Sequence, residues 1–264
     1  MKTSIIQFTP LLGDVGVNTD KVNRLLSRAH KSKLVVLPEL ANSGYNFINR
    51  EHALSAASPV TESAYIDMLV SHARKKKQYI ISGFHERSGD LLYNTSVLIS
   101  GDGVIGKYRK LHLFMHEKEI FAPGDLGFPV FELDGFKLGM LICFDYLFSE
   151  AWRITALNGA DIVAHPSNLI TGNALKMIPA QALSNRIFIL TANRSGTERD
   201  LTFNGKSFAV NPSGDLISSV ADDREIILTF DVEPQLARDK YITPLNHVFE
   251  DRFPAYYQAV CDQK

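Results

Sequence analysis

The chain has 264 residues, of which 45% are hydrophobic, so it can build a large core. Its formal net charge is -1, and it therefore has no overall positive charge to bind nucleic acid. Small molecules are the expected partners. Its two cysteines, Cys143 and Cys261, are too few and too far apart for a disulfide-rich secreted domain and favour a cytoplasmic location. No apolar stretch approaches the roughly 20 residues that span a bilayer, and Gln7 and Pro10 interrupt the first apolar run, so neither a membrane anchor nor a signal peptide is expected.

The first half of the chain alternates short apolar runs with segments of helical periodicity, as is typical of an α/β protein. In chain order we expect a strand over 4–8, a helix capped by Asn18, a strand over 34–37, a helix over 61–77, and strands over 79–83, 93–99 and 104–110. The strand over 34–37 is apolar at every position, which indicates burial on both faces.

The second half continues this alternation and adds a late antiparallel set. We expect strands over 128–133, 137–143 and 161–165, a helix capped by Ser149 between the last two, a helix over 178–185, and strands over 188–192, 206–211, 215–220 and 225–232. No internal repeat, low-complexity segment or linker interrupts the order. We therefore expect one domain over residues 1–264, with helices on both sides of a large mixed sheet or of two packed sheets.

Two patterns resemble sites of other kinds but lack the context that those sites need. The glycines of 101–106 match G-x-G-x-x-G, yet no helical periodicity follows them, so a hairpin turn explains them better than a dinucleotide site. His112 and His116 are four residues apart, but neither a glutamate at position 113 nor a cysteine pair completes a zinc motif. We expect no metal site.

The apolar run over 137–143 ends on Cys143 and turns at once into polar sequence and a helix. A side chain at the carboxyl end of a strand, directly before a helix, lies at the edge where open α/β sheets place their ligands. Backbone N–H groups at such a bend can bind an anion. We therefore take Cys143 as the candidate reactive residue.

Two further reactive side chains lie at strand ends, Glu39 after the strand over 34–37 and Lys110 at the end of the strand over 104–110. Each has an ordinary explanation by itself: a carboxylate at a helix start, a surface cation and, for Cys143, an inert buried thiol. Together they supply an acid or base, a cation for an oxyanion and a nucleophile. This is the minimum set for acyl transfer through a thioester.

The segments that carry these residues resemble the three signatures of the nitrilase superfamily of carbon-nitrogen hydrolases. They are Pro38-Glu39-Leu40, Tyr108-Arg109-Lys110-Leu111-His112 and Leu141-Ile142-Cys143-Phe144-Asp145, in the order and spacing of the family. The similarity spans nearly the whole chain and includes 121–125, 165–168, 193–194 and 205–207. It implies a four-layer α-β-β-α sandwich with two mixed β-sheets, assembled as a homodimer or a larger even-numbered homo-oligomer.

The resemblance also implies roles for individual residues. It makes Cys143 the nucleophile, Glu39 the general base and later the acid, and Lys110 the electrophilic stabiliser. A second glutamate of the family falls at Glu117, seven residues after Lys110, with Glu119 as the competing position. A cation beside the thiol favours the thiolate, and Glu39 can accept the thiol proton.

These roles imply a thiol hydrolase that needs no metal or organic cofactor. With a small aliphatic amide, Cys143 attacks the carbonyl carbon, Lys110 and the backbone N–H of Phe144 hold the oxyanion, and ammonia and a carboxylic acid are released. Nitrilases share these residues, so action on small aliphatic nitriles or dinitriles is the alternative, followed by hydrolysis of N-carbamoyl amino acids. A non-catalytic binding protein on the same fold is disfavoured, because all four catalytic positions of the family are present.

Segments just beyond two of the strand ends are expected to line the acyl pocket. The first segment, 42–47, contains Tyr45. The second, 167–171, contains Ser167 and Asn168 and begins two residues after His165. Their small and polar content predicts a short aliphatic or mono-acid substrate, although Tyr45 fits a packing role equally well.

The last stretch, 241–264, is rich in apolar residues without a strand or a long helix of its own. Such a patch is a liability when exposed and must be covered. It either folds back on its own sandwich or packs on a neighbouring subunit. The resemblance favours the neighbour, because tails of the family commonly cross the interface of a symmetric dimer.

Overall fold

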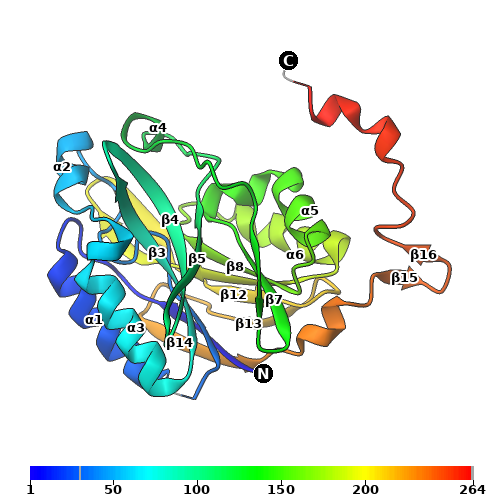
Figure 1. Cartoon of the computed structure of the whole chain (residues 1–264), viewed down its shortest axis with the longest axis horizontal. Helices are drawn as coiled ribbons and strands as arrows, with labels where there is room; N and C mark the ends of the chain where they lie inside the picture. Colours follow the sequence, from blue (N-terminus) through cyan, green and yellow to red (C-terminus); the bar gives the residue numbers. More distant parts are fainter. Residues whose placement is uncertain (30, 263–264) are drawn as a thin grey trace.

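Two six-stranded sheets face each other in the computed structural model, which describes residues 1–29 and 31–262 (Figure 1). The first sheet has the order β14 (Ile226–Asp231), β1 (Lys2–Gln7), β2 (Leu34–Val36), β3 (Tyr79–Ser88), β4 (Leu91–Ser100), β5 (Gly103–Arg109). The second has the order β13 (Leu216–Ser219), β12 (Phe208–Val210), β9 (Phe188–Asn193), β8 (Ile162–Ser167), β7 (Phe136–Met140), β6 (Val130–Leu133). In each sheet one inner strand, β2 or β8, runs parallel to both neighbours while the outer pairs are antiparallel, so both sheets are mixed.

Helices cover the outer face of each sheet. The helices α1 (Val15–Arg28) and α3 (Ala64–Lys76) pack on the first sheet, and α5 (Ser149–Leu157) and α6 (Asn173–Asn185) pack on the second (Figure 1). Two short helices, α2 (Arg50–Ser55) and α4 (Glu117–Ile120), lie in the segments after β2 and β5. The predicted four-layer α-β-β-α sandwich with two mixed sheets is confirmed.

The strand β2 shows why its sequence is apolar throughout. Leu34 and Val36 belong to the core between the two sheets, whereas Val35 packs with the residues of α1 and α3. The neighbouring strand β3 repeats the pattern, with Ile81 in the inner core and Ile80 beneath the helices. Because successive side chains of a strand point to opposite faces, apolar residues at every position are needed to fill both layers.

The helix α1 begins earlier than its capping pattern predicted. Asp14 is the N-cap, and its side chain accepts a hydrogen bond from Val17 N at 3.0 Å. Asn18 lies inside the helix, fully buried, where its amide bonds to the main chain of Leu11 and donates to the carbonyl of Asn42. The prediction that Asn18 caps the helix was wrong, because the adjoining loops use its hydrogen bonds instead.

Other departures from the expected elements are local. Ser149 is the first residue of α5, but its hydroxyl accepts from Gln181 Nε2 on α6 at 2.9 Å instead of capping the helix. The sequence patterns missed α2, which Asn49 caps, and a hairpin of β10 (Ser195–Glu198) with β11 (Leu201–Asn204). These elements are too short to show a clear periodicity.

The end of the chain leaves the sandwich (Figure 1). It forms a small hairpin of β15 (Tyr241–Thr243) with β16 (Asn246–His247), followed by 3₁₀ turns at Pro254–Tyr256 and Gln258–Val260. Leu245 is 89% exposed and Tyr256 is 84% exposed, so a single chain leaves much of this tail uncovered. Among residues 1–29 and 31–262, no helix combines the length and apolar character needed to cross a membrane.

Candidate active site

Glu39 lies just beyond the carboxyl end of β2, in a segment that turns sharply against the neighbouring strand. Leu40 has a φ of 47° at this turn. Gly83 on β3 lets the turn come close, because a side chain there would lie 2.3–2.5 Å from main-chain atoms of the turn. Main-chain hydrogen bonds from Gly83 to Pro38 and from Ala41 to Gly83 fix this approach. The Glu39 side chain is thereby held fully buried.

Lys110 follows β5, and its main chain bonds to Asn94 O at 2.8 Å and to Gly124 N at 2.9 Å. The side chain is fully buried, and Nζ lies 2.7 Å from Glu39 Oε1 and 2.8 Å from the Glu117 carboxylate. Burial disfavours the charge of Lys110, but the charges of Glu117 and Glu39 hold its pKa above the ordinary value. The side chain is therefore an ammonium group between two carboxylates.

Glu117 opens the short helix α4 and points back to Lys110. Its carboxylate also accepts from Phe114 N at 2.6 Å. Burial raises the pKa of Glu117 to about 7; Lys110 opposes the rise and the charge of Glu39 adds to it. The side chain of the competing residue, Glu119, is 74% exposed at the surface. The structure thus places Glu117, and not Glu119, beside the lysine.

Asn94 on β4 joins the two carboxylates and was not singled out from the sequence. Its Nδ2 donates to Glu39 Oε1 at 2.6 Å and to Glu117 Oε1 at 3.0 Å. The available signal was an asparagine inside a strand expected to be buried, since a buried amide requires partners. Asn94 and Lys110 therefore both donate hydrogen bonds to the carboxylates of Glu39 and Glu117.

Cys143 lies where the chain leaves the second sheet. The strand β7 ends at Met140, opposite Ala164, and not at Cys143 as predicted. The ladder stops there because Ile142 N donates to the Asp145 side chain at 2.7 Å instead of to a neighbouring strand. A 3₁₀ turn then begins at Cys143, whose φ is 44°.

The Cys143 thiol lies beside the charged cluster. Burial raises its pKa well above the ordinary value, and the charges of Glu39 and Glu117 add to the rise. Lys110 and a hydrogen bond from the backbone N–H of Asn168 oppose it. The resting form in this environment is therefore the thiol, which needs a base to become a nucleophile.

Asp145 ties the turn of Cys143 to the segment of Lys110. It is fully buried, and its Oδ2 accepts from the Tyr108 hydroxyl at 2.8 Å. Its Oδ1 lies 2.7 Å from His112 Nδ1. Because Tyr108 and His112 lie on either side of Lys110 in the sequence, one buried carboxylate joins the segment of Lys110 to the turn of Cys143.

Two of the predicted substrate-binding residues have polar groups near the cluster. Tyr45 is partly buried, and burial and the nearby charges of Glu117 and Glu39, with a hydrogen bond to Glu117, raise its pKa. Asn168 is 4% exposed, and its side-chain amide has no hydrogen-bond partner among the residues that the structure describes. An amide buried in this way is suited to a polar group of a ligand.

The other two predicted substrate-binding residues are engaged within the protein. His165 and Ser167 are fully buried, and Ser167 Oγ lies 3.2 Å from His165 Nδ1. His165 Nε2 lies 2.9 Å from the main-chain carbonyl oxygen of Cys143. Because both ring nitrogens have contacts, the geometry favours a role in positioning the turn over direct contact with a substrate.

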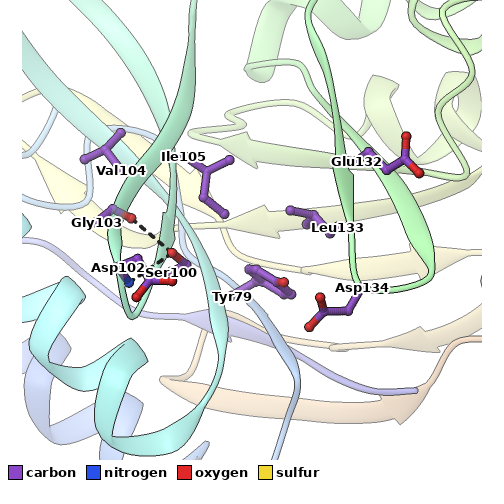
Figure 2. A pocket seen from close by; sticks show the side chains of 9 residues that line it. All are labelled: Tyr79, Ser100, Asp102, Gly103, Val104, Ile105, Glu132, Leu133 and Asp134. Atoms are coloured by element: carbon purple, nitrogen blue, oxygen red, sulfur yellow. Dashed lines mark hydrogen bonds between the residues drawn. The ribbon is translucent and has the colours of Figure 1, made fainter.

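A small cavity of about 30 Å³ opens beside the cluster. Tyr45 and Glu117 line it, together with the apolar side chains of Phe47, Ile120 and Phe121. A larger open groove of about 460 Å³ lies between β5 and β6, at the edges of the two sheets. Figure 2 shows the side chains that line it. None of the candidate residues lines that groove, whereas Tyr45 and Glu117 line the small cavity.

Comparison with known proteins identifies the family. A sequence model of the family described as carbon-nitrogen hydrolase matches residues 2–241. The chain belongs to the carbon-nitrogen hydrolase family. This hydrolase is 41% identical over 259 residues to a nitrilase from Pyrococcus abyssi, an alignment that covers 97% of this chain and 99% of the relative.

Solved structures agree with this membership. A carbon-nitrogen hydrolase from Helicobacter pylori G27 superimposes with a TM-score of 0.88 at 25% identity, covering 100% of this chain and 99% of that one. A mutant amidase from Nesterenkonia sp. AN1, solved with acrylamide added to its active-site cysteine, superimposes with a TM-score of 0.77 at 25% identity, covering 91% and 96%. The resemblance found in the three motifs is confirmed, and the protein is a carbon-nitrogen hydrolase of the nitrilase and amidase type.

Proposed function

We propose that this carbon-nitrogen hydrolase cleaves small aliphatic amides through a thioester on Cys143 and releases ammonia and a carboxylic acid. The observation that carries the proposal is the position of Lys110 Nζ between the carboxylates of Glu39 and Glu117, with the Cys143 thiol beside them. A nucleophile, a base and a fixed cation in one buried place are the parts that acyl transfer requires.

Glu39 acts as the base through Oε2. Its Oε1 is occupied by Lys110 and Asn94, whereas Oε2 is buried without a hydrogen-bond partner in the described part of the chain. Oε2 takes the thiol proton as the Cys143 sulfur bonds to the carbonyl carbon and the electron pair of the C=O bond moves to oxygen. Lys110 Nζ and the Phe144 N–H stabilise the oxyanion that forms.

Collapse of the tetrahedral intermediate breaks the carbon-nitrogen bond. Glu39 gives its proton to the departing nitrogen, so that ammonia leaves and the thioester remains on Cys143. Water then gives a proton to Glu39 as its oxygen attacks the thioester carbon. Collapse of this second intermediate releases the acid and returns the proton to the sulfur, while Glu117 continues to hold Lys110.

The space beside the cluster supports a short acyl group. The bulky side chains of Tyr45, Phe47 and Phe121 line the cavity next to Glu117 and restrict the space for an acyl group there. The Asn168 amide, which has no hydrogen-bond partner among residues 1–29 and 31–262, favours an amide over a nitrile. Its Oδ1 can accept from the N–H of a primary amide, whereas a nitrile has no N–H to offer. Tyr45 lines the cavity beside Glu117, with its hydroxyl directed to that carboxylate.

A nitrilase is the second candidate, because the Pyrococcus abyssi relative at 41% identity carries that name. A nitrile would form a thioimidate on Cys143, which needs one more water molecule before the common thioester. Hydrolysis of N-carbamoyl amino acids ranks third, since their ureido group offers the same N–H donors as an amide.

Ammonia release from a panel of short amides, short nitriles and dinitriles, and N-carbamoyl amino acids separates these functions. We expect the highest kcat/KM with a short primary amide such as propionamide, and an acyl group on Cys143 detected by mass spectrometry after a rapid acid quench. A preference for nitriles would replace the amidase assignment with the second candidate. Failure of the whole panel would favour a non-catalytic binding protein on this fold.

We also propose that the tail packs on a neighbouring subunit in a homodimer or a larger even-numbered homo-oligomer. An open hollow of about 920 Å³ lies between α5, α6 and the tail. Apolar side chains line it from both sides, with Ile154 and Met177 on the helices and Tyr257 and Val260 on the tail. In a two-fold dimer each chain presents these surfaces to the other, so one contact covers both.

The organisation of the chain follows from the same observations. The family match over 2–241 supports one hydrolase domain, with the tail after it, in the expected single unit of 1–264. Both cysteines are free thiols, and a nucleophilic thiol suits a reducing compartment. We therefore place the enzyme in the cytoplasm.

A further inference from the structure

The carbonyl group of the nucleophile is hydrogen-bonded by a histidine that the proposed reaction does not use. His165 on β8 places Nε2 2.9 Å from the carbonyl oxygen of Cys143. A carbonyl oxygen only accepts hydrogen bonds, so Nε2 carries the proton. Thr191 Oγ1 and Ser167 Oγ each lie 3.2 Å from Nδ1, and either hydroxyl can donate to it. The surroundings thus select the neutral tautomer with the proton on Nε2.

Burial keeps the ring in this form at neutral pH. Burial lowers the pKa of His165 to about 4, although its contact with the Cys143 carbonyl opposes the change. Trp152 packs edge-on against the ring with 5.5 Å between the ring centroids. The imidazole is therefore a fixed, uncharged donor and not a proton carrier.

The hydrogen bond acts on the peptide group that joins Cys143 to Phe144. The carbonyl of Cys143 and the N–H of Phe144 belong to one planar trans peptide and point in opposite directions. A contact that fixes the carbonyl therefore fixes the direction of the N–H. Hydrogen bonding at the oxygen also polarises the peptide and strengthens the N–H as a donor.

The turn at the nucleophile needs support of this kind. The φ of Cys143 is 44°, in a region that residues with a side chain adopt only where their surroundings enforce it. Asp145 fixes the turn from within by accepting from Ile142 N. His165 fixes it from the neighbouring strand, so the peptide that carries the nucleophile is held from two directions.

We propose that His165 is a positioning residue that orients and strengthens the Phe144 N–H as an oxyanion donor. The proposal rests on the proposed function, in which that N–H stabilises the oxyanion. Because the oxyanion exists in the transition state and not in the bound substrate, loss of the contact should lower kcat and leave KM nearly unchanged. Alkylation of the Cys143 sulfur at a saturated carbon forms no oxyanion and should not depend on His165.

A matched pair of variants separates the hydrogen bond from the packing of the ring. The side chains introduced by His165→Met and His165→Gln have similar length, but only glutamine carries an N–H donor. We expect His165→Met to lower kcat for a short amide about tenfold or more, with KM within about threefold of wild type. His165→Gln should recover most of the lost kcat, and both variants should react with iodoethane, an alkylating agent without a carbonyl group, at rates within about twofold of wild type.

Three outcomes would overturn the proposal: wild-type kcat in the methionine variant, an equal loss in the glutamine variant, or a fall in alkylation rate that parallels kcat. The last would show a displaced thiol instead of a misdirected donor. Nitrogen-15 NMR of the wild-type imidazole tests the contact without mutation, and a proton on Nδ1 at neutral pH would contradict it. Because that spectrum needs no turnover, it stays informative for His165 even if the amide panel fails.

Discussion

Lys110 donates through Nζ to Glu39 Oε1 over 2.7 Å, although 71 positions separate the two residues in the chain. Both side chains are fully buried, and Glu117 approaches the same nitrogen. Removal of one partner from a buried ion pair leaves an uncompensated charge, which costs about 3–5 kcal/mol. The three charged residues are therefore one unit, in which each depends on the others for stability as well as for the proposed reaction.

Cys143→Ala should abolish ammonia release while the protein stays folded, because the change removes one sulfur atom and little packing. Cys261→Ala is the control, since Cys261 is exposed in the tail and should be dispensable. Ammonia release and thermal unfolding are measured for both variants. Retention of about a tenth of wild-type activity by the Cys143 variant, or a clear loss in the Cys261 variant, would refute the choice of nucleophile.

Lys110→Arg should lose most of kcat, by about a hundredfold, because a planar guanidinium fork cannot take the place of a compact ammonium in a fully buried site. Lys118→Arg is the matched control, since Lys118 lies on the exposed side of α4 next to Glu117. Steady-state kinetics on the preferred amide are the measurement. A near-normal kcat with a raised KM would make Lys110 a binding residue instead.

The sequence pattern predicts those segments in which the order of apolar and polar residues matches the burial of each residue in the folded protein. The strand β2 is buried along its whole length, and its sequence is apolar at every position because both of its faces are covered. Glu39, Lys110 and Cys143 were singled out because each follows a strand within a few residues, in a short segment that resembles a family signature.

The contacts that the sequence pattern does not predict join segments that are far apart. Asn94 meets Glu39 over 55 positions, and no local feature of β4 shows which carboxylate its amide will contact. The ring of His165 contacts the Cys143 carbonyl over 22 positions, and the residues around His165 in the sequence give no sign of this contact. Asn18 suits both a helix cap and a loop contact, so residue type alone did not decide between them.

Glu117→Gln should remove a pH-dependent loss of stability between pH 4.5 and pH 7. Burial raises the pKa of Glu117 from its ordinary value of 4.5 to about 7, so the folded state binds a proton in this range that the unfolded state has released. The stabilisation of the folded state by this proton is fully present below pH 4.5 and is lost as the pH rises to about 7. Between pH 4.5 and pH 7 the free energy of unfolding of wild type should therefore fall by about 3 kcal/mol relative to that of the glutamine variant.

Thermal unfolding of wild type and Glu117→Gln, followed from pH 4.5 to pH 8, provides the measurement. The Tm of the variant minus the Tm of wild type should increase by roughly 5–10 °C from pH 4.5 to pH 8. Glu119→Gln, at an exposed site on the same helix, should run parallel to wild type. If wild type instead gained stability with rising pH relative to Glu117→Gln, attraction to Lys110 would outweigh burial and the assigned direction of the pKa shift would be incorrect.

Deletion of residues 241–264 should lower the mass measured by light scattering to that of a single chain, because the tail exposes apolar side chains that a second subunit would cover. Phe253→Ser, Tyr256→Ser and Val260→Ser together should do the same without shortening the chain, since all three side chains are largely exposed and contribute little to the fold of one chain. Leu11→Ser, at an exposed apolar residue outside the tail, should leave the assembly unchanged. A truncated protein that stays fully dimeric would exclude the tail as the main source of assembly, and a monomeric full-length protein would remove the proposed interface altogether.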